Sequence, residues 1–557
     1  MPAEFSLRAN LVNLFTHSVA PGTIHVAEGK IRAVAPDQSS GADPALPYAL
    51  PGFVDAHVHV ESSLLVPAEF ARLAVTHGTV ATVSDPHEIG NVLGVAGVDY
   101  MLASGRSGPF KFCFGAPSCV PATPFETAGA TITAADIEQL FQNPAIGYLA
   151  EMMNWPGVLN RDAEVMAKIE LARRYGRPVD GHAPGLRGAD ARRYAEAGIS
   201  TDHECFTAAE ALDKLAVGMK ILIREGSAAR NFDALIELLP EHFENLMFCS
   251  DDKHPDTLVL GHINQLVQRA VARGQDVFKV LRVACLNPVL HYNLPVGLLR
   301  AGDPADFIVV DDLRDFRVRQ TYLDGVLVAE NGATRIPSVP CPVVNNFHAP
   351  PVQPQDFQLP APAQQPETDN QKPTIRVIEC FDGQLITARH DLPATVENGF
   401  VVPDIAQDVL KLTVVNRYEP AAPAVAFIQG FGLKFGALAS SVGHDSHNIT
   451  AVGCDDESLA RAVNLVIEAK GGLAAVGVKG EEILLPLPVA GLMSDQPGHQ
   501  VAAAYAAADA LAKRLGSPLG APFMTLSFMA LLVIPSLKLS DKGLFDGEAF
   551  QFLDAVV

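Results

Sequence analysis

Two histidines separated by a single residue are the first candidates for chemistry in this chain. His57 and His59 stand near the end of the apolar segment 51–60, PGFVDAHVHV. If this segment is a β-strand, side chains at positions i and i+2 point to the same side, so the two imidazoles lie together with Asp55 behind them. Two adjacent imidazoles at a strand end make half of a metal site. A lone pair of this kind also occurs in ordinary protein cores, so the interpretation depends on further ligands.

Further polar side chains of metal-binding type each come directly after a short apolar segment. They are Glu151 after residues 145–150, His182 after 177–181, His203 after 198–202, and Asp251 and Asp252 after 245–250. Helix-like stretches such as 162–175 and 189–197 lie between the apolar segments. This alternation is typical of βα units with a parallel sheet. If the sheet closes as a barrel, all strand ends meet on one face, where barrel active sites are built.

The number of strand-like segments supports closure of the sheet. Eight such segments are present, at 52–58, 79–84, 110–114, 146–150, 178–181, 199–202, 219–223 and 246–250. A helix-like stretch at 259–273 follows them. We therefore predict an α/β protein with a TIM-like (β/α)8 barrel over residues 51–298.

The two flanks of the barrel read as further strands. Segments with a strand-like residue pattern occur at 5–15 and 23–34 before the barrel and at 306–310 and 317–330 after it. We therefore assign residues 1–50 plus 299–345 to one small β-sandwich built from both flanks. Residues 346–374 are rich in proline and glutamine, which predicts an extended or disordered linker.

A separate C-terminal α/β domain is predicted over residues 375–557. Its expected elements are strands near 375–388, 411–418, 425–430 and 448–453 and a helix at 455–470. The linker is flexible in composition, so this domain need not contact the barrel. The polar cluster at 444–448 is an ordinary product of Asx and Ser turns, and a loop that closes over the barrel mouth is the alternative.

Composition and charge fit a soluble enzyme with a small-molecule substrate. The chain has 557 residues, of which 48% are hydrophobic, and a net charge of −22. This charge argues against nucleic acid and anionic membranes as partners. Residues 1–13 contain no apolar signal segment, no apolar run reaches membrane-spanning length, and the eight cysteines include no CxxC pair. We expect a cytoplasmic protein with reduced thiols, and a homo-oligomer, a dimer.

The text around the candidate ligands resembles the adenine deaminase family of the amidohydrolase superfamily. The order His-x-His, Glu, His, His, Asp is that of the superfamily. The phrases that resemble the family are PGFVDAHVHVESS at 51–63, SDPHEIG at 84–90, EMMNWP at 151–156, DGHAPG at 180–185, DHE at 202–204, SDDK at 250–253, GHDSHN at 443–448, LPLPVAGLMSD at 485–495 and residues 531–539. The resemblance covers nearly the whole chain, and its motifs are specific.

The resemblance implies a hydrolase that converts adenine to hypoxanthine and ammonia by attack of a metal-bridged hydroxide at C6, as in purine salvage or adenine catabolism. Another binuclear amidohydrolase, acting on a cyclic amide or N-acyl substrate, is the alternative. Glu151 in place of a lysine and the extra domain at 375–557 argue against it. A non-catalytic binding protein on the same fold is a third class, disfavoured because every expected ligand type is present.

The ligand types indicate two divalent metal ions. His57 and His59 with a carboxylate can hold one ion, and His182 and His203 can hold a second. Glu151 has two oxygens and can bridge them, at a place where many relatives use a carbamylated lysine. Two ions that share a hydroxide lower its pKa toward neutrality. Imidazole and carboxylate ligands suit Mn, Fe or Zn, and the resemblance favours Mn or Fe.

Asp251 is the predicted proton carrier. Amidohydrolases place a metal ligand after the eighth strand, and this residue takes the proton from the hydroxide and passes it to the leaving ammonia. Asp252 is the alternative, because two adjacent aspartates align ambiguously. If Asp251 has the role, we expect Asp252 to support the loop or the substrate.

A second acid is needed because C6 of adenine becomes electrophilic when N1 is protonated or hydrogen-bonded. Base deaminases use a glutamate that is not a metal ligand for this purpose. Glu61, His87 and Glu88 are the candidates here. The alternative for the last two is that Asp85-Pro86 merely starts a turn and a helix.

Other polar residues near the strand ends are candidates for contact with the substrate. They are Asn154, Trp155, Arg224, Ser227, Asp252, Ser446 and His447. Each has an ordinary alternative role, such as a salt bridge for Arg224, core packing for the single tryptophan, and turn formation for the polar cluster.

Overall fold

Eight parallel strands form the centre of the molecule in the computed structural model, which describes residues 4–37, 41–362 and 373–557. They are β5 (Phe53–Val58), β6 (Thr79–Ser84), β7 (Lys111–Ala116), β8 (Ile146–Met152), β9 (Val179–Gly181), β10 (Thr201–Asp202), β11 (Lys220–Arg224) and β12 (Leu246–Cys249). Each lies within two residues of its predicted position. Both faces of β5 and β6 are buried, as expected for a parallel sheet covered by helices.

The strands close into a ring, so the predicted barrel is confirmed. Strands β5 to β9 form one parallel sheet and β10 to β12 another. The first gap is closed by a parallel bridge between Val58 and Asp251, with the Asp251 amide donating to the His57 carbonyl at 2.9 Å. At the second gap the Ser200 amide donates to the Val179 carbonyl, also at 2.9 Å. All eight carboxyl ends therefore open on one face.

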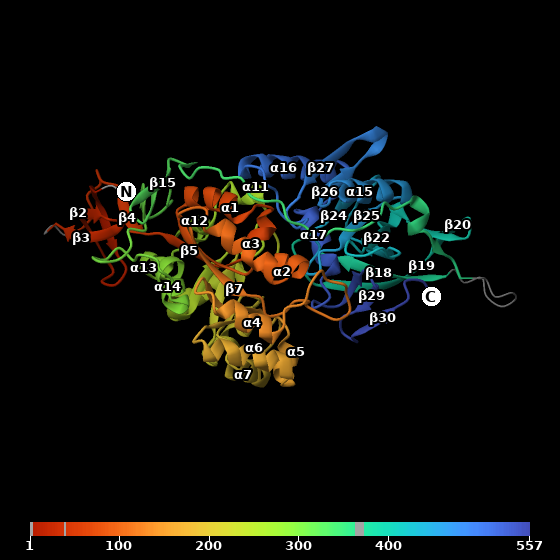
Figure 1. Cartoon of the computed structure of the whole chain (residues 1–557), viewed down its shortest axis with the longest axis horizontal. Coiled ribbons are helices and arrows are strands. Elements are labelled where there is room, and N and C mark those ends of the chain that lie inside the picture. Colours follow the sequence, from red (N-terminus) through yellow and green to blue (C-terminus); the bar gives the residue numbers. More distant parts are fainter. Residues whose placement is uncertain (1–3, 38–40, 363–372) are drawn as a thin grey trace.

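Helices surround the ring and fill the connections between its strands (Figure 1). They are α1 (Pro67–Ala74), α2 (His87–Leu93), α3 (Val95–Gly105), α4 (Ala134–Phe141), α5 (Trp155–Leu159), α6 (Ala163–Arg174), α7 (Gly188–Glu196), α8 (Ala208–Ala216), α9 (Phe232–Leu235), α10 (Leu239–His242), α11 (Pro255–Leu258), α12 (Ile263–Ala272), α13 (Val277–Leu281) and α14 (Asn287–Tyr292). Local sequence sets their bounds. In α6 the Asp162 side chain accepts from two backbone amides at the start, and Arg173 and Arg174 complement the helix dipole at the end.

The two flanks of the barrel meet in one eight-stranded sheet at the left of Figure 1. Its strands are β1 (Phe5–Asn13), β2 (Ser18–Ala27), β3 (Lys30–Pro36), β4 (Tyr48–Pro51), β13 (Phe307–Val310), β14 (Val318–Leu323), β15 (Val326–Glu330) and β16 (Ala333–Thr334). The antiparallel pair β4–β13 joins the N-terminal and C-terminal flanks. The hydrogen bonds therefore run through one continuous sheet, with its own small core that includes Ile24 and Phe307.

The segment after the flank sheet differs from the expected free linker. Phe347, Val352 and Phe357 are buried in the core of the C-terminal domain. A short 3-10 helix at Pro354–Phe357 carries a capping box. Proline keeps this chain extended, but its aromatic side chains have apolar partners, so it packs instead of remaining free. Residues 363–372 of the predicted linker lie outside the described residues.

The C-terminal domain is built on a mixed eight-stranded sheet in the order β19-β18-β23-β22-β25-β24-β26-β27. The domain's strands are β17 (Leu359–Pro360), β18 (Thr374–Cys380), β19 (Thr387–Pro393), β20 (Thr395–Glu397), β21 (Phe400–Val402), β22 (Leu410–Val415), β23 (Ala424–Gln429), β24 (Ala437–Ser440), β25 (Ile449–Gly453), β26 (Gly472–Val476), β27 (Glu482–Pro486), β28 (Leu537–Ser540), β29 (Gly543–Asp546) and β30 (Gln551–Leu553). Its helices are α15 (Asp456–Glu468), α16 (Gly498–Arg514) and α17 (Pro522–Ser527).

The predicted single strand at 375–388 is two strands, β18 and β19. A turn at Asp382-Gly383 reverses the chain, and Gly383 takes a positive φ of 69° there. Glycine accepts this conformation without strain. The reversal brings the β18–β19 turn against the barrel, where the Gly383 carbonyl accepts from the Ala229 amide at 3.1 Å.

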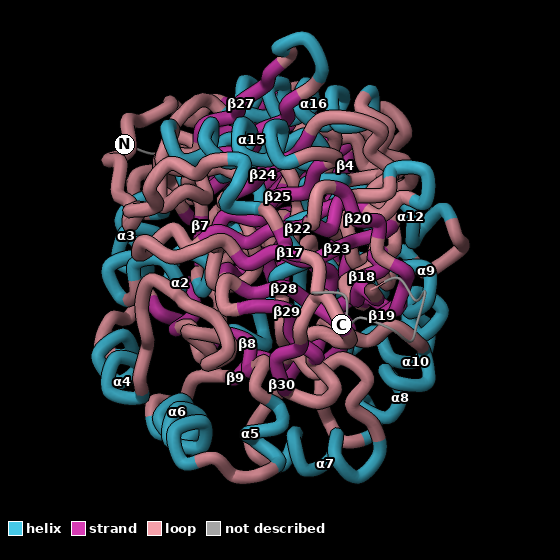
Figure 2. Tube along the Cα trace, turned by 90° about the vertical axis from the view of Figure 1, so that its right-hand side faces the viewer, coloured by secondary structure: helices cyan, strands magenta, loops and turns pink. Residues whose placement is uncertain are grey.

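The C-terminal domain packs directly on the barrel. Figure 2 shows its strands in front, with the barrel helices around them. Asn448 donates to the Thr127 carbonyl at 2.9 Å and Asp541 accepts from the Thr127 amide at 2.9 Å. One continuous buried core includes side chains of both parts. The linker composition did not require this contact, and the contact agrees with the expectation from the polar cluster at 444–448 that the domain folds back over the barrel.

Two further expectations can be compared with the described chain. No helix among the described residues is long and apolar enough to cross a membrane. All eight cysteines are free thiols.

Candidate active site

The two histidines of β5 are positioned by a buried network behind them. Asp55 accepts from the Ser250 amide at 3.0 Å, from the Ser250 hydroxyl, and from His262 Nε2 at 2.8 Å. These bonds tie β5 to β12 and α12 below the site. His57 lies in β5 and His59 follows directly after the strand, two positions along the chain. Their Nε2 atoms lie 3.2 Å apart. The predicted common orientation of this pair is therefore present in the fold.

Glu151 at the end of β8 divides the remaining histidines into two groups. Its Oε1 lies 3.5 Å from the ring nitrogens of both His59 and His87. Its Oε2 lies 2.9 Å from His182 Nδ1 and 3.1 Å from His203 Nε2. Each carboxylate oxygen thus faces a different pair of imidazoles, which is the arrangement that a bridging ligand needs.

Asp251 stands above the His57 and His59 rings. Its Oδ1 is 3.5 Å from His57 Nε2 and 3.2 Å from His59 Nε2. Its backbone has a positive φ of 52°, which is uncommon for a residue with a side chain. This conformation and the bridge to Val58 place the carboxylate next to the two imidazoles, inside the ring of barrel strands. Asp252 points elsewhere and accepts from the Ser62 hydroxyl at 2.5 Å.

A guanidinium connects two of the carboxylates. Arg224 at the end of β11 donates from Nη1 to Asp251 Oδ2 at 2.7 Å, and its other contacts go to both oxygens of Glu204. Arg224 is 1% exposed. Such a buried bidentate pair fixes both carboxylates geometrically. Arg224, predicted as a substrate contact, is thus also a positioning group for Asp251.

The donor set fits divalent metal ions. Several groups of three or four buried His, Asp and Glu side chains converge within ligand range, among them His57, His59 and Asp251, and His182, His203 and Glu204. Two nitrogens bound at about 2.0–2.1 Å to one tetrahedral ion lie ~3.3 Å apart, close to the 3.2 Å seen between His57 and His59. Buried carboxylates and imidazoles at this density favour a cation.

The electrostatics of the site favour ionised carboxylates at its centre. Burial opposes ionisation of Glu151, but the charges of His182 and His203 outweigh it and hold the pKa of Glu151 well below its usual range. Asp251 behaves alike: burial opposes its ionisation, but the Arg224 charge together with the contacts to His57 and His59 and the His203 charge holds its pKa well below the usual range. For Asp252, burial and the Asp251 charge both raise the pKa. The two adjacent aspartates are therefore electrostatically different.

The C-terminal domain forms the roof of the site. His444 Nδ1 lies 2.6 Å from Glu88 Oε1, and His447 Nε2 lies 2.5 Å from Glu88 Oε2. The His444 ring stacks on Phe528 with centroids 5.0 Å apart. Asp445 reaches His87 Nε2 at 3.9 Å. The loop at 443–448 therefore lies at the mouth of the barrel, as the lid alternative supposed.

A buried lysine joins two parts of this roof. Lys538 Nζ donates to the carbonyls of Leu385 at 2.6 Å and Phe528 at 2.9 Å. It has no exposed surface, and burial lowers its pKa to about 7. Because Leu385 and Phe528 both line the catalytic pocket, this tie sets the position of the apolar roof.

The resulting pocket has a charged floor and a largely apolar roof. Its lining consists of His59, His87, Glu88, Glu151, Met153, His182, His203, Glu204, Arg224, Asp251, Asp252, Leu385, His444, Asp445, Phe528 and Leu531. It includes most of the predicted metal-binding residues and four predicted substrate or acid residues, Arg224, Asp252, His87 and Glu88. His57 lies just beneath it.

Several predicted residues lie outside this lining. Glu61 accepts from the Ile89 amide at 3.2 Å behind α2, and burial raises its pKa to about 7. Asn154 caps α5 by accepting from Gly157. Trp155 is the first residue of that helix and packs against the core. Local helix formation thus uses the two residues that were predicted to contact substrate.

Three predicted contacts from loops also fall beside the pocket. Ser227 bonds Thr257 at 2.9 Å in a neighbouring cavity. His447 Nε2 contacts Glu88 Oε2 and does not line the pocket. The Ser446 backbone carbonyl accepts a hydrogen bond from the Tyr418 hydroxyl. Ser446 and His447 therefore belong to the support of the loop, while their neighbours His444 and Asp445 reach the pocket.

Sequence reasoning did not propose Glu204 as a site residue, and it considered Asp85 only together with His87 and Glu88. Glu204 lies 3.4 Å from His203 and 3.6 Å from His182. Asp85 lies 3.2 Å from His87 Nδ1, and it belongs to a group with His59 and Glu151. Both stand within the quoted phrases DHE and SDPHEIG, directly after strands, so strand-end position was the available signal.

Comparison with known proteins adds the relationship of the whole chain. Residues 48–328 match the amidohydrolase family, and residues 384–551 match the adenine deaminase C-terminal domain. An adenine deaminase from Salinibacter ruber is 56% identical and covers 100% of both chains. One from Sulfurovum sp. is 54% identical over 99% of both, and one from Methanosarcina mazei is 49% identical over 98% of both.

Proposed function

Because this chain belongs to the amidohydrolase family and, within it, to the adenine deaminases, we infer that it hydrolyses adenine to hypoxanthine and ammonia. The observation that carries this inference is similarity over the full length, including the domain that supplies the roof of the pocket. The alternative substrates, cyclic amides and N-acyl compounds, are not favoured by any of these relatives.

We propose that the residues at the strand ends hold two divalent ions, with Mn or Fe favoured and Zn as the alternative. His57, His59 and Asp251 would hold one ion, His182 and His203 the other, and Glu151 would bridge them. Support comes from the opposite orientation of the two Glu151 oxygens. Ions bound here would lower the pKa of a water molecule and so supply the nucleophile at neutral pH.

Asp251 is proposed to move the proton. Its pKa is held well below the usual range, Arg224 holds its Oδ2 at 2.7 Å, and its Oδ1 faces the proposed ion beside His57 and His59, so this oxygen would lie next to the attacking water. General acid–base catalysis requires such a group within hydrogen-bond reach of the reacting atoms. It accepts the proton from the attacking water and returns it to the leaving amino group. Asp252, with its raised pKa, is a hydrogen-bonding neighbour of the substrate.

The ring of adenine is proposed to lie under the roof. Met153, Leu385, Phe528 and Leu531 present apolar surface, which suits the faces of a planar heteroaromatic ring. Of the three predicted ring acids, His87 and Glu88 line the pocket, and we assign them the hydrogen bonds to the ring nitrogens. Burial opposes protonation of His87, but the charges of Asp85 and Glu88 raise its pKa well above the usual range, so it can donate.

The remaining expectations are proposals of the same kind. We propose a cytoplasmic homodimer that takes free adenine and neither nucleic acid nor membrane as its partner. Sedimentation of the metal-loaded protein tests the dimer, and elemental analysis of protein purified without added metal tests the ions.

A substrate comparison tests the function. Purified protein is incubated with adenine, dihydrouracil, hydantoin and N-acetyl sugars, and ammonia release and loss of each substrate are followed. Adenine alone should yield ammonia, with hypoxanthine as the second product. Hydrolysis of a cyclic amide or acetyl group at a higher kcat/KM than adenine would replace the proposal with the alternative.

A further inference from the structure

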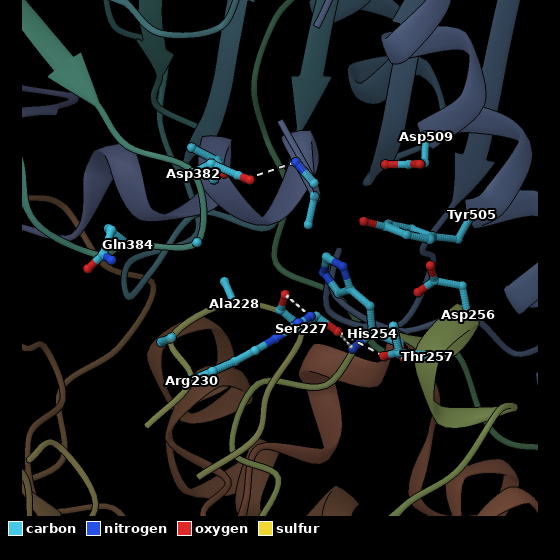
Figure 3. A pocket seen from close by; sticks show the side chains of 15 residues that line it. Ser227, Ala228, Arg230, His254, Asp256, Thr257, Asp382, Gln384, Tyr505 and Asp509 are labelled. Carbon is cyan, nitrogen blue, oxygen red and sulfur yellow. Dashed lines mark hydrogen bonds between the residues drawn. The ribbon is translucent and has the colours of Figure 1, made fainter. Parts of the chain in front are cut away.

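A second cavity lies beside the catalytic pocket, between the barrel and the C-terminal domain (Figure 3). The barrel contributes 227–230 and 254–257, and the C-terminal domain contributes 382–384, part of α16 and 520–525. The cavity volume is about 350 Å³, at the small end of the range of small-molecule sites. Among the described residues, the two cavities share no lining residue.

The inner wall of this cavity carries polar atoms that lack partners. The Tyr505 hydroxyl and His254 Nδ1 have no hydrogen-bond partner within the described chain, although these residues are only 1% and 5% exposed. One oxygen each of Asp256 and Asp509 is also buried and unpaired there. Figure 3 shows the Tyr505 hydroxyl pointing into the cavity, with the two carboxylates on either side of its ring. Buried polar groups without partners destabilise a protein, so a ligand is expected.

The charge of the cavity selects the kind of ligand. Asp256, Asp382 and Asp509 line it, and Arg230 is the cation at its mouth. The Arg230 guanidinium already donates to the carbonyls of Gly226 and Ser227. Three carboxylates against one occupied guanidinium leave an excess of negative charge, which attracts cations.

The neighbouring groups do not cancel this excess at the inner wall. Lys513 pairs with Asp509 Oδ2 at 2.6 Å and leaves Oδ1 unpaired. His254 adds no positive charge, because burial lowers its pKa to about 3. The free atoms at the inner wall are therefore mostly acceptors, and they require donors from the ligand.

We propose that this cavity binds a small cation that carries N–H groups, of which ammonium is the smallest. Such a cation can donate to the unpaired oxygens of Asp256 and Asp509 and to the Tyr505 hydroxyl. The Tyr505 ring, whose centroid lies 4.5 Å from that of the tilted His254 ring, adds an attraction for positive charge. Ammonium is also the product class of the proposed deamination, but binding in this cavity does not depend on that reaction.

The test compares ammonium with potassium, which has a similar size and no N–H donors. The melting temperature of the full, metal-loaded protein is measured in ammonium chloride and in potassium chloride at equal concentrations. At about ten times the dissociation constant, one bound ammonium should raise Tm by about 1 °C in a chain of this length. Asp256→Asn, Asp509→Asn and Tyr505→Phe should each lose at least half of this difference.

The matched control is Asp190→Asn, which changes an exposed carboxylate outside the cavity and should keep the full difference. If an aspartate variant does not fold, two other measurements test the proposal. They are the Tm difference of Tyr505→Phe, which removes one oxygen only, and calorimetric titration of ammonium into the wild-type chain. An equal effect of potassium, or a full ammonium effect in Tyr505→Phe, overturns the proposal. Because no turnover is measured, failure of this test leaves the deaminase assignment intact, and failure of the adenine assay leaves this one intact.

Discussion

The floor and the roof of the catalytic pocket are built by different means. The floor consists of charged side chains at the ends of adjacent parallel strands, tied together by Asp55 and Arg224. The roof consists mainly of apolar side chains from a domain far along the chain, positioned by Lys538 and by the pairing of His444 with Glu88. Rigid strand ends give the floor accurate geometry, while the roof excludes water, which strengthens the electrostatics beneath it. The difference indicates that changes in the floor act on the chemistry and changes in the roof act on fit.

Removal of two floor ligands should have the largest effect. His57→Ala combined with His203→Ala removes one imidazole from each proposed ion, and elemental analysis should show loss of at least one metal equivalent together with loss of measurable turnover. The matched control is His291→Ala, whose ring contacts Ser200 before β10 starts; it should keep both. Full metal occupancy in the double variant would contradict the assignment of the floor.

Asp251→Asn should separate metal binding from proton transfer. The amide keeps an oxygen but cannot accept a proton, so turnover should fall roughly 10²–10⁴-fold, the contribution of general acid–base catalysis, while some metal remains. Asp252→Asn is the neighbouring control and should lose less. If the two variants exchanged these effects in steady-state kinetics, the proton carrier would be Asp252.

Variants of the roof should change kinetics without changing metal content. His447→Ala removes the 2.5 Å contact to Glu88. Hydrogen bonds to charged groups contribute about 1.5–3 kcal/mol, so kcat/KM should fall by about tenfold or more. Ser446→Ala should have a smaller effect because its backbone carbonyl makes the contact to Tyr418.

The control for the roof is His390→Ala, an exposed residue of the same domain that pairs with Glu379. It should leave both kinetics and metal content unchanged. Loss of metal in His447→Ala would mean that the roof also holds the floor in place.

The smallest effect should come from the Lys538 tie and should depend on pH. Burial lowers the pKa of this lysine to about 7 in the folded chain, against the ordinary lysine value of 10.5. Between these values the unfolded chain binds the proton and the folded chain does not, so the stability contribution rises with pH. The slope is at most about 1.4 kcal/mol per pH unit.

Lys538→Met removes this titration. Urea unfolding at pH 7 and pH 9.5 should show the wild-type advantage over the variant growing with pH, and the variant should have a higher KM because Leu385 and Phe528 lose their tie. A difference between the two proteins that is constant across this range would refute the buried neutral lysine.

The positions of the barrel ligands were accessible from sequence because of one regularity. Apolar segments of strand length ended in His57, Glu151, His182, His203 and Asp251, and the parallel topology brings such ends together whatever the intervening helices contain. The candidate contacts that lie outside the pocket lining stand on connections. Asn154 caps a helix, Trp155 packs beside it and Ser227 lines the second cavity, since local turns and caps redirect side chains in ways that strand periodicity does not describe.

The sequence by itself determined the barrel and its charged floor, because these follow from periodicity and from residue types at strand ends. The family followed from the resemblance of the quoted motifs to known proteins. Only the tertiary structure decided which parts of the C-terminal domain reach the site. The segment 346–374 has a composition that permits many domain positions, and the choice among them rests on long-range packing of apolar surface. That packing places His444 and Phe528 over Glu88, and it brings Tyr505 beside Asp256 at a cavity that neither segment forms alone.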